Sequence, residues 1–369
     1  MSEFRTIREL CSVVVDCPHS TPKWTANGKI VIRNNNIKHG RIDFSSPSYT
    51  DDEHFAQRIK RAKPQPGDII ITREAPIGDV GMIPENTECC LGQRMVLLRA
   101  NQSVCDNFYL LYSLQSLYVQ HQISWSEGTG TTVSNLRIPH LEQIQIPYFP
   151  LEQQAKISSV LRALEEKIEN NRRLNDNLQQ QAQAIYSSMF IDNSESAWTH
   201  GHLSDLVTVK YGKDHKKLSE GIYPVYGSGG IMRYVERPLY DKESVLIPRK
   251  GTLNNVMYVN QPFWSVDTMF YTEMKLPNVA KFVYHFVKAK DLASMNAGSA
   301  VPSMTTDILN AMEVVIPSAS ALEEFEALVA PMYEAMEAND VQSQALSKVR
   351  DTLLPKLMSG EIDVSSVLL

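Results

Sequence analysis

The stretch LEQQAKISSVLRALEEKIENNRRLNDNLQQQAQAIYSSMF, residues 151–190, carries apolar side chains at alternating steps of four and three residues. From Ile157 to Met189, eight of the ten positions in this series are apolar, and only Asn171 and Asn175 interrupt it. A seam that repeats every 3.5 residues indicates a long helix that packs against a second helix.

A second copy of the seam lies 168 residues further on and runs from Phe325 to Leu357. The polar positions recur in it, because Asn171 falls on Asn339 and Asn175 on Ser343. We therefore predict that the two helices pack on each other as an antiparallel coiled coil; two unrelated surface helices are the alternative. The residues expected in the contact are Leu161, Leu164, Ile168, Asn171, Leu178, Val329, Met332, Met336, Asn339 and Leu346.

The segments outside the helices also repeat. VLIPR at 245–249 echoes IIITR at 69–73 and aligns Arg249 with Arg73, while Leu309 matches Leu141 at the helix offset of 168. This indicates a tandem duplication. The predicted fold class is α+β: two similar α/β units separated by two long antiparallel helices in a pseudo-two-fold repeat. The predicted domains are 1–149, a first globular unit; 150–197, the first long helix; 198–317, a second globular unit; and 318–369, the second long helix and tail.

Within each unit the pattern predicts short strands and one helix. Pro355 is expected to kink or thin the end of the second long helix, and Gly360 to stop it. The expected strands are 12–15, 29–33, 67–73, 95–99, 143–147, 206–210 and 245–249, and the expected helices are 108–122 and 281–288.

Composition sets outer limits. The chain has 369 residues, 43% hydrophobic and 21% charged, with a net charge of −6, as in ordinary globular proteins. The acidity lies mainly in residues 318–369, with nine acidic and three basic side chains, so the predicted units can still carry basic faces. No apolar run reaches the ~18 residues of a membrane span. The unpaired spacing of the five cysteines and the absence of an apolar leader favour a cytoplasmic protein with reduced thiols.

Motifs for catalysis are missing. The sequence has no Walker A, HExxH, GxSxG or EF-hand pattern, and no Gly-rich loop suited to a methyl-donor nucleotide. Glu165 and Lys167 have the ExK spacing of a nuclease, but they fall on the predicted helix flank. We expect no catalytic residue, metal ligand or cofactor in this chain; a stand-alone adenine methyltransferase is the enzyme alternative.

Basic and planar side chains instead gather before and after matching strands. Lys and Arg supply charge for phosphates, and planar Arg, Asn and Gln suit base edges. A solvated charged face is the alternative for any one cluster. The predicted DNA-contacting residues are Arg33, Asn35, Lys60, Arg61, Arg73, Lys213, Lys216, Ser228, Arg249, Lys250 and Asn254.

Several longer motifs resemble one known family. They are GDIIITREAPIGDVG at 67–81, IPYFPLEQQAKI at 146–157, YPVYGSGGI at 223–231, VLIPRKGTLNNVMYV at 245–259, PFWSVDTMFY at 262–271 and LLPKLMSGEI at 353–362. The chain is similar over nearly its full length to the specificity subunit of Type I restriction–modification enzymes. One departure is Asn254, where the family pattern carries a Gly and the first half of this chain keeps Gly78.

The resemblance implies a non-catalytic, sequence-specific DNA-binding subunit that reads a bipartite, asymmetric site and directs methylation and restriction. The implied partners are double-stranded DNA, two modification (methyltransferase) subunits and restriction (translocase and nuclease) subunits. S-adenosylmethionine, ATP and magnesium are implied on those partner subunits and not on this chain. The alternative from another class is a coiled-coil scaffold or protein-binding adaptor without DNA readout.

Overall fold

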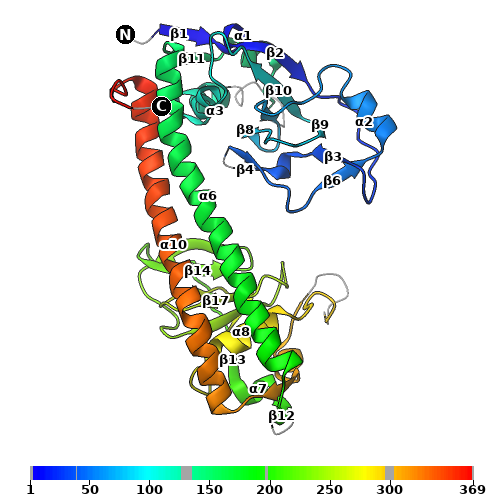
Figure 1. Cartoon of the computed structure of the whole chain (residues 1–369), viewed down its shortest axis with the longest axis vertical. Helices are drawn as coiled ribbons and strands as arrows, with labels where there is room; N and C mark the ends of the chain where they lie inside the picture. Colours follow the sequence, from blue (N-terminus) through cyan, green and yellow to red (C-terminus); the bar gives the residue numbers. More distant parts are fainter. Residues whose placement is uncertain (1–2, 39, 126–134, 196–197, 296–302, 368–369) are drawn as a thin grey trace. The chain divides into compact units, whose positions relative to one another are not determined.

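The computed structural model describes residues 3–38, 40–125, 135–195, 198–295 and 303–367, and the chain divides into two compact units. Unit 1 combines Met1–Asn170 with Val341–Leu369, and unit 2 is Asn171–Asp340. The long helices α6 (Leu151–Ser187) and α10 (Ala319–Ser359) each contribute one part to unit 1 and one part to unit 2. They lie side by side in Figure 1, where α6 is green and α10 is orange to red.

The predicted seam joins these two helices. All ten positions of each seam are at least partly buried; the last position of the first seam, Met189, lies in the π-helical turn η3 (Ser188–Asp192) that follows α6. In unit 2, Asn175 donates from Nδ2 to the carbonyl oxygen of Met336 (3.2 Å), and the rings of Tyr186 and Phe325 lie 6.2 Å apart. Rising numbers along α6 therefore meet falling numbers along α10, which confirms the predicted antiparallel pairing.

The polar break of the two seams is a shared hydrogen-bond network. Asn171, with 2% of its surface exposed, donates from Nδ2 to the carbonyl oxygen of Asn339 (3.3 Å). Asn339 in turn donates from its own Nδ2 to Oδ1 of Asn175 (2.8 Å). Equivalent residues of the two repeats thus meet each other at this point. A buried asparagine of this kind pairs best in one alignment, so it specifies the register of the helices.

The far end of α10 contains Pro355, where a kink or thinning was expected. The helix is continuous through this residue to Ser359. It stops before Gly360, as predicted; this residue has a φ of +76°, which glycine adopts without steric cost. The tail then returns to unit 1, where Val364 is buried in the same apolar core as Leu357.

Unit 1 is built from short strands. Its main sheet is antiparallel, in the order β2-β10-β7-β8, and it is accompanied by a three-stranded sheet β6-β3-β9 and by the pairs β1-β11 and β4-β5. The strands are β1 (Glu3–Thr6), β2 (Cys11–Asp16), β3 (Lys29–Ile32), β4 (Ile37–Lys38), β5 (Arg41–Ile42), β6 (Ser48–Thr50), β7 (Ile69–Arg73), β8 (Ile77–Met82), β9 (Cys89–Leu91), β10 (Met95–Ala100) and β11 (Gln145–Tyr148).

Unit 2 repeats this arrangement. Its main sheet has the order β13-β19-β16-β17, its three-stranded sheet is β15-β14-β18, and β12 pairs with β20. The central strand of each three-stranded sheet has one antiparallel and one parallel neighbour: β3 with β6 and β9, and β14 with β15 and β18. The strands are β12 (Thr199–His202), β13 (Val207–Tyr211), β14 (Tyr223–Gly227), β15 (Gly230–Val235), β16 (Ser244–Pro248), β17 (Met257–Val259), β18 (Trp264–Ser265), β19 (Met269–Met274) and β20 (Glu313–Ile316).

Short helices complete both units. The segment expected as one helix at 108–122 is two helices, because Ser116 has an extended backbone and its hydroxyl accepts from the Val119 N–H to cap the second one. The short helices are α1 (Ile7–Leu10), η1 (Asn34–Asn36), α2 (Asp52–Arg58), α3 (Asn107–Gln115), α4 (Leu117–Ser124), α5 (Ile138–Gln143), α7 (Leu203–Leu206), α8 (Ala280–Lys288) and α9 (Thr306–Asn310).

Each core includes both long helices. The main core of unit 1 contains Ile157 and Leu161 of α6, and that of unit 2 contains Ala182 of α6 with Val329 of α10. The two halves of the helix pair are therefore structural parts of the units. No described helix combines the length and apolarity needed to cross a bilayer.

Candidate nucleic-acid interface

In unit 2, the loops that follow β13, β14, β16 and β18 gather at one edge of the sheets. The Val266 N–H donates to the carbonyl of Tyr226 (3.1 Å), and the Arg249 N–H donates to that of Thr268 (2.9 Å). The Lys213 N–H donates to the carbonyl of Ser265 (2.8 Å). We call residues 211–216, 227–229, 249–251 and 266–268 the loop edge of unit 2. It brings together Lys213, Lys216, Ser228, Arg249 and Lys250, all predicted DNA contacts.

Unit 1 has an equivalent loop edge, formed by residues 16–19, 33–36, 73–76 and 92–94. The Gly92 N–H donates to Ile32 (2.7 Å), and the Arg73 N–H donates to Arg94 (2.8 Å), as in unit 2. Arg33 and Asn35 therefore lie on the loop that corresponds to the Ser228 loop. The sequence offset of 168 did not reveal this correspondence, because insertions change the spacing between the strands.

Arg73 and Arg249 are equivalent in the backbone. The Leu136 N–H donates to the carbonyl of Arg73 (3.0 Å), and 168 residues later the Met304 N–H donates to that of Arg249 (2.9 Å). Their side chains have different surroundings, and the reason lies two strands away in the sheet, beyond β10 in unit 1 and beyond β19 in unit 2. Asp16 ends β2 and Tyr211 ends β13 at corresponding positions.

The Arg73 guanidinium is occupied within unit 1. Nη1 forms an ion pair with Oδ2 of Asp16 (2.8 Å), Nε donates to the Leu136 carbonyl (2.8 Å), and Nη2 donates to Oδ1 of Asn135 (3.1 Å). Only 12% of the Arg73 side chain and 19% of the Asp16 side chain are exposed. This geometry gives Arg73 a structural task at the loop edge, where the sequence pattern predicted DNA contact.

The Arg249 guanidinium has fewer partners. Nη1 donates to the main-chain carbonyl of Asp267 (3.2 Å), and the guanidinium carbon lies 5.4 Å from the ring centroid of Tyr211. No carboxylate among the described residues forms an ion pair with it. Its charge is therefore directed to the surface of unit 2, next to the exposed side chain of Lys250.

A hollow of about 390 Å³ opens at the loop edge of unit 2. It is lined by 227–229 and 266–268 together with His215 and Met232. Gly251 borders it with a φ of +86°, and a Cβ there would lie 2.7 Å from the hydroxyl of Ser228. Glycine is therefore required for the two loops to approach this closely.

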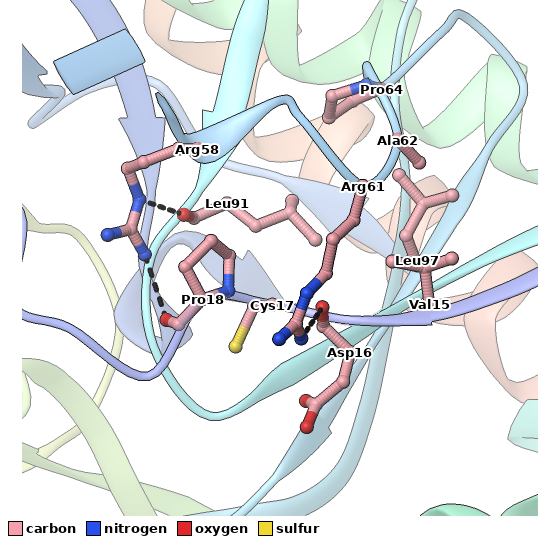
Figure 2. A pocket seen from close by; sticks show the side chains of 10 residues that line it. All are labelled: Val15, Asp16, Cys17, Pro18, Arg58, Arg61, Ala62, Pro64, Leu91 and Leu97. Atoms are coloured by element: carbon pink, nitrogen blue, oxygen red, sulfur yellow. Dashed lines mark hydrogen bonds between the residues drawn. The ribbon is translucent and has the colours of Figure 1, made fainter. Parts of the chain in front are cut away.

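A smaller hollow, of about 10 Å³, lies in unit 1 beside residues 16–18 of the loop edge (Figure 2). Arg58 is buried there and donates to the main-chain carbonyls of Leu91 (2.7 Å) and Pro18 (3.2 Å). Arg61 donates from Nη1 to the carbonyl of Asp16 (3.3 Å) but is otherwise exposed. Of the two arginines that precede β7 here, Arg58 is therefore part of the interior and Arg61 remains at the surface.

The other predicted contacts have the following surroundings. Lys60, Lys213, Lys216 and Lys250 are exposed and form no ion pair among the described residues. Arg33 is exposed, and its guanidinium carbon lies 5.2 Å from the centroid of the Trp24 ring. Asn35 is exposed at the surface of η1. These side chains are available to a ligand.

Asn254 is engaged inside unit 2. Its Nδ2 donates to Oδ1 of Asp291 (3.0 Å), and its Oδ1 accepts from the Ala293 N–H (3.0 Å). Its φ is not positive, so the glycine of the family pattern is not needed here; the left-handed residue of this turn is Gly251.

The structure offers little for catalysis or metal binding. The described residues contain no group of three or more His, Cys, Asp or Glu side chains arranged to hold a metal ion. All five cysteines are free and buried. Burial raises the pKa of Cys11 to about 12 and that of Cys90 to about 11, which makes these thiols poor nucleophiles.

One residue of the unit 2 loop edge escaped the sequence reasoning: Asp267, which is exposed beside the hollow. A lone aspartate has no distinctive spacing. The signal that could have found Asp267 is the motif PFWSVDTMFY, in which it lies between two buried strands.

The comparisons with known proteins agree with this architecture. A family described as the Type I restriction modification DNA specificity domain matches residues 3–180 and 195–324. The MjaIX Type I restriction enzyme specificity subunit of Methanocaldococcus jannaschii is 25% identical over 345 residues, covering 82% of this chain and 79% of that protein. A putative type I specificity subunit of Mycoplasma genitalium is 24% identical over 273 residues, covering 68% and 70%. The crystal structure of an S subunit of a Type I restriction–modification system from M. genitalium has the same fold, with a TM-score of 0.59 and 21% identity over 97% of this chain and 96% of that one.

Proposed function

Because the chain belongs to the family of Type I restriction–modification DNA specificity subunits, we propose that each of its two units reads one half of a bipartite, asymmetric DNA site. A specificity subunit is the non-catalytic part of its enzyme and recognises the DNA target for the complex. In this proposal, 1–149 and 198–317 are the recognition segments, and 150–197 and 318–369 provide the spacer helices and the tail.

The observation that carries this proposal is the recurrence of the loop edge. Both edges combine exposed cations with planar or hydroxyl side chains, which suits phosphates and base edges respectively. We assign phosphate contacts to Lys60, Arg61, Lys213, Lys216 and Lys250 because they are exposed and free of ion pairs to carboxylates among the described residues.

Base contacts are assigned to Arg33, Asn35, Ser228 and Arg249. Arg73 and Asn254 are retained as positioning residues, since their polar atoms already bind within the protein. The two edges thus present different side chains on the same backbone frame. Different DNA-contacting side chains on equivalent backbones would make the two half-sites differ, which accounts for an asymmetric site.

The partners in this proposal are two modification subunits and the restriction subunits, which carry S-adenosylmethionine, ATP and magnesium. We assign the docking of the modification subunits to the exposed surface of the long helices in each unit. The support is the exposure of apolar side chains there, namely Leu174 and Leu328 in unit 2, and Val341 and Val349 in unit 1. A cytoplasmic location follows from access to cellular DNA.

The decisive experiment is co-expression of this chain with the modification subunit encoded beside it, followed by methylation mapping of the host genome. Adenine methylation at a single two-part motif, absent when this chain is omitted, is the expected result. A complex that forms but methylates no motif would contradict the reading role.

Salt dependence separates DNA reading from the scaffold alternative. Binding through Z phosphate contacts makes the logarithm of the association constant fall with the logarithm of salt concentration at a slope of about −0.9Z. With five assigned phosphate contacts, we expect a slope of roughly −4 to −5. A salt-insensitive protein partner and no DNA binding would favour the scaffold.

A further inference from the structure

Asp267 is an exposed carboxylate on the loop edge of unit 2, which also carries Asp214 and the cations Lys213, Lys216, Arg249 and Lys250. It borders the hollow of unit 2, and no ion pair holds its carboxylate among the described residues. The main-chain carbonyl of Asp267 accepts a hydrogen bond from Nη1 of Arg249 (3.2 Å). Residue 267 and the Arg249 guanidinium are therefore in direct contact on the loop edge.

A free carboxylate is unfavourable beside a polyanion unless it gains a specific contact. Phosphates repel it, whereas base edges in the major groove offer two amino donors, N4 of cytosine and N6 of adenine. Adenine also presents the acceptor N7 next to N6, which repels a second carboxylate oxygen and suits an amide. Cytosine presents no acceptor there, so a carboxylate discriminates in favour of cytosine.

The Arg249 guanidinium, beside Asp267, suits the base that pairs with cytosine. The guanine that pairs with cytosine presents the acceptors O6 and N7 in the major groove, and arginine donates to both. We propose that Asp267 and Arg249 together read one G·C base pair in the half-site of unit 2, Asp267 accepting from cytosine N4 and Arg249 donating to guanine. This inference rests on the proposed function.

The hollow supplies room and further polar groups for the reading of this base pair. Ser228 lines it and presents a hydroxyl, and His215 lines it with a buried Nδ1 that has no hydrogen-bond partner among the described residues. The exposed Lys213 and Lys250 on the same loop edge offset the repulsion between Asp267 and the phosphates.

Unit 1 cannot make the same contact. The position equivalent to Asp267 is Gln93, whose amide donates to the carbonyl of His19. The following residue, Arg94, forms an ion pair with Glu74 (3.3 Å), and Arg73 is held by Asp16. The G·C requirement therefore belongs to one half-site only.

The test is selection of bound sequences from a random duplex DNA library by the full-length chain, with the variants Asp267→Asn and Arg249→Gln. Matched controls are Asp241→Asn and Arg237→Gln, which make the same chemical changes at exposed sites beyond the opposite ends of β16 and β15. Circular dichroism verifies that all four variants are folded.

The wild-type chain is expected to select a G·C pair at one position of one half-site, with roughly 5- to 150-fold discrimination. Asp267→Asn shifts that position from cytosine towards adenine, and Arg249→Gln relaxes the same base pair. The other half-site and both controls keep the wild-type preference.

Four results would overturn the inference. A wild-type motif without a G·C pair at the affected position, or two variants that alter different base pairs, removes the shared contact while leaving the proposed function intact. An unchanged motif in Asp267→Asn does the same. Failure of the wild-type chain to select any motif removes the proposed function, and the inference with it.

Discussion

Replacing Arg73 by alanine tests whether this residue stabilises unit 1 or contacts DNA. The substitution removes the guanidinium from Asp16, Leu136 and Asn135 in one step. Asp16 would keep its contact with the ring of His19 (2.9 Å), which is mostly exposed. One carboxylate oxygen of Asp16 is already buried without a hydrogen-bond partner among the described residues.

The expected cost follows from the burial of the pair. Removing one partner of a buried ion pair costs about 3–5 kcal/mol, because the remaining charge is left uncompensated. Since the side chains of Arg73 and Asp16 are 12% and 19% exposed, we place the loss at the lower end, about 3 kcal/mol. The equivalent substitution Arg249→Ala removes one bond to a neutral carbonyl and one ring contact, so about 1 kcal/mol is expected there.

Hydrogen exchange of the full-length chain separates the two cases. In Arg73→Ala, the opening free energy of amides in β7 and β10 is expected to fall by about 3 kcal/mol, while amides in β16 and β19 keep their protection. The double variant with Asp16→Asn is expected to cost less than the sum of the single variants, because the pair is coupled.

The opposite pattern would refute this reasoning. If Arg73→Ala leaves the protection of β7 unchanged but lowers DNA affinity tenfold or more, the guanidinium contacts DNA and its partners inside unit 1 are incidental. Affinity is measured at a temperature at which the variant is fully folded.

Three further predictions concern unit 2. Burial lowers the pKa of His285 from 6.5 to about 4, so the folded chain leaves this ring neutral where the unfolded chain protonates it. The free energy of unfolding should fall by about 3 kcal/mol as pH drops from 6.5 to 4, and denaturation of His285→Gln should lack that component. Lys281→Met should cost about 3 kcal/mol in denaturant melts, because it leaves buried charge on Glu326 uncompensated. Lys250→Ala should weaken binding to all DNA sequences and reduce the salt slope by about 1, whereas Lys242→Ala at the far end of β16 should not.

Each of these has a contrary outcome. An identical pH profile in wild type and His285→Gln would show that the pKa of this imidazole is the same in the folded and the unfolded chain. Unchanged stability of Lys281→Met would mean that the carboxylates paired with Lys281, those of Glu243 and Glu326, are solvated. A change in sequence preference with Lys250→Ala would move this residue from phosphate to base contact.

Much of the fold could be read from periodicity. The seam of α6 and its copy in α10 predicted two helices and their antiparallel pairing, and the structure confirms both. Asn171 and Asn339, expected in the contact, form a hydrogen bond there. Strand β7 was also predicted, because its consecutive isoleucines are buried on both faces. These features are local or repeat at a constant spacing, so they can be recognised in the linear sequence.

The candidate site was less accessible to the same reasoning. The sequence correctly matched Arg73 with Arg249 by their positions at the ends of matching strands. The Arg73 guanidinium nevertheless forms an ion pair inside unit 1, whereas the Arg249 guanidinium binds only a main-chain carbonyl and a ring. The difference lies in Asp16 and Tyr211, which are distant in sequence from the arginines they touch. The identity of residue 249 does not reveal that Tyr211, at the end of a distant strand, lies beside it.

The sequence by itself determined that this protein is a tandem repeat of globular units with long helices, that it lacks catalytic motifs, and that it resembles DNA specificity subunits. Only the tertiary structure decided which cations are available, which loops share an edge and where a hollow opens beside Asp267. The physical reason is that helix periodicity depends on neighbours three or four residues apart. Availability depends on partners that the sheets bring together from distant parts of the chain.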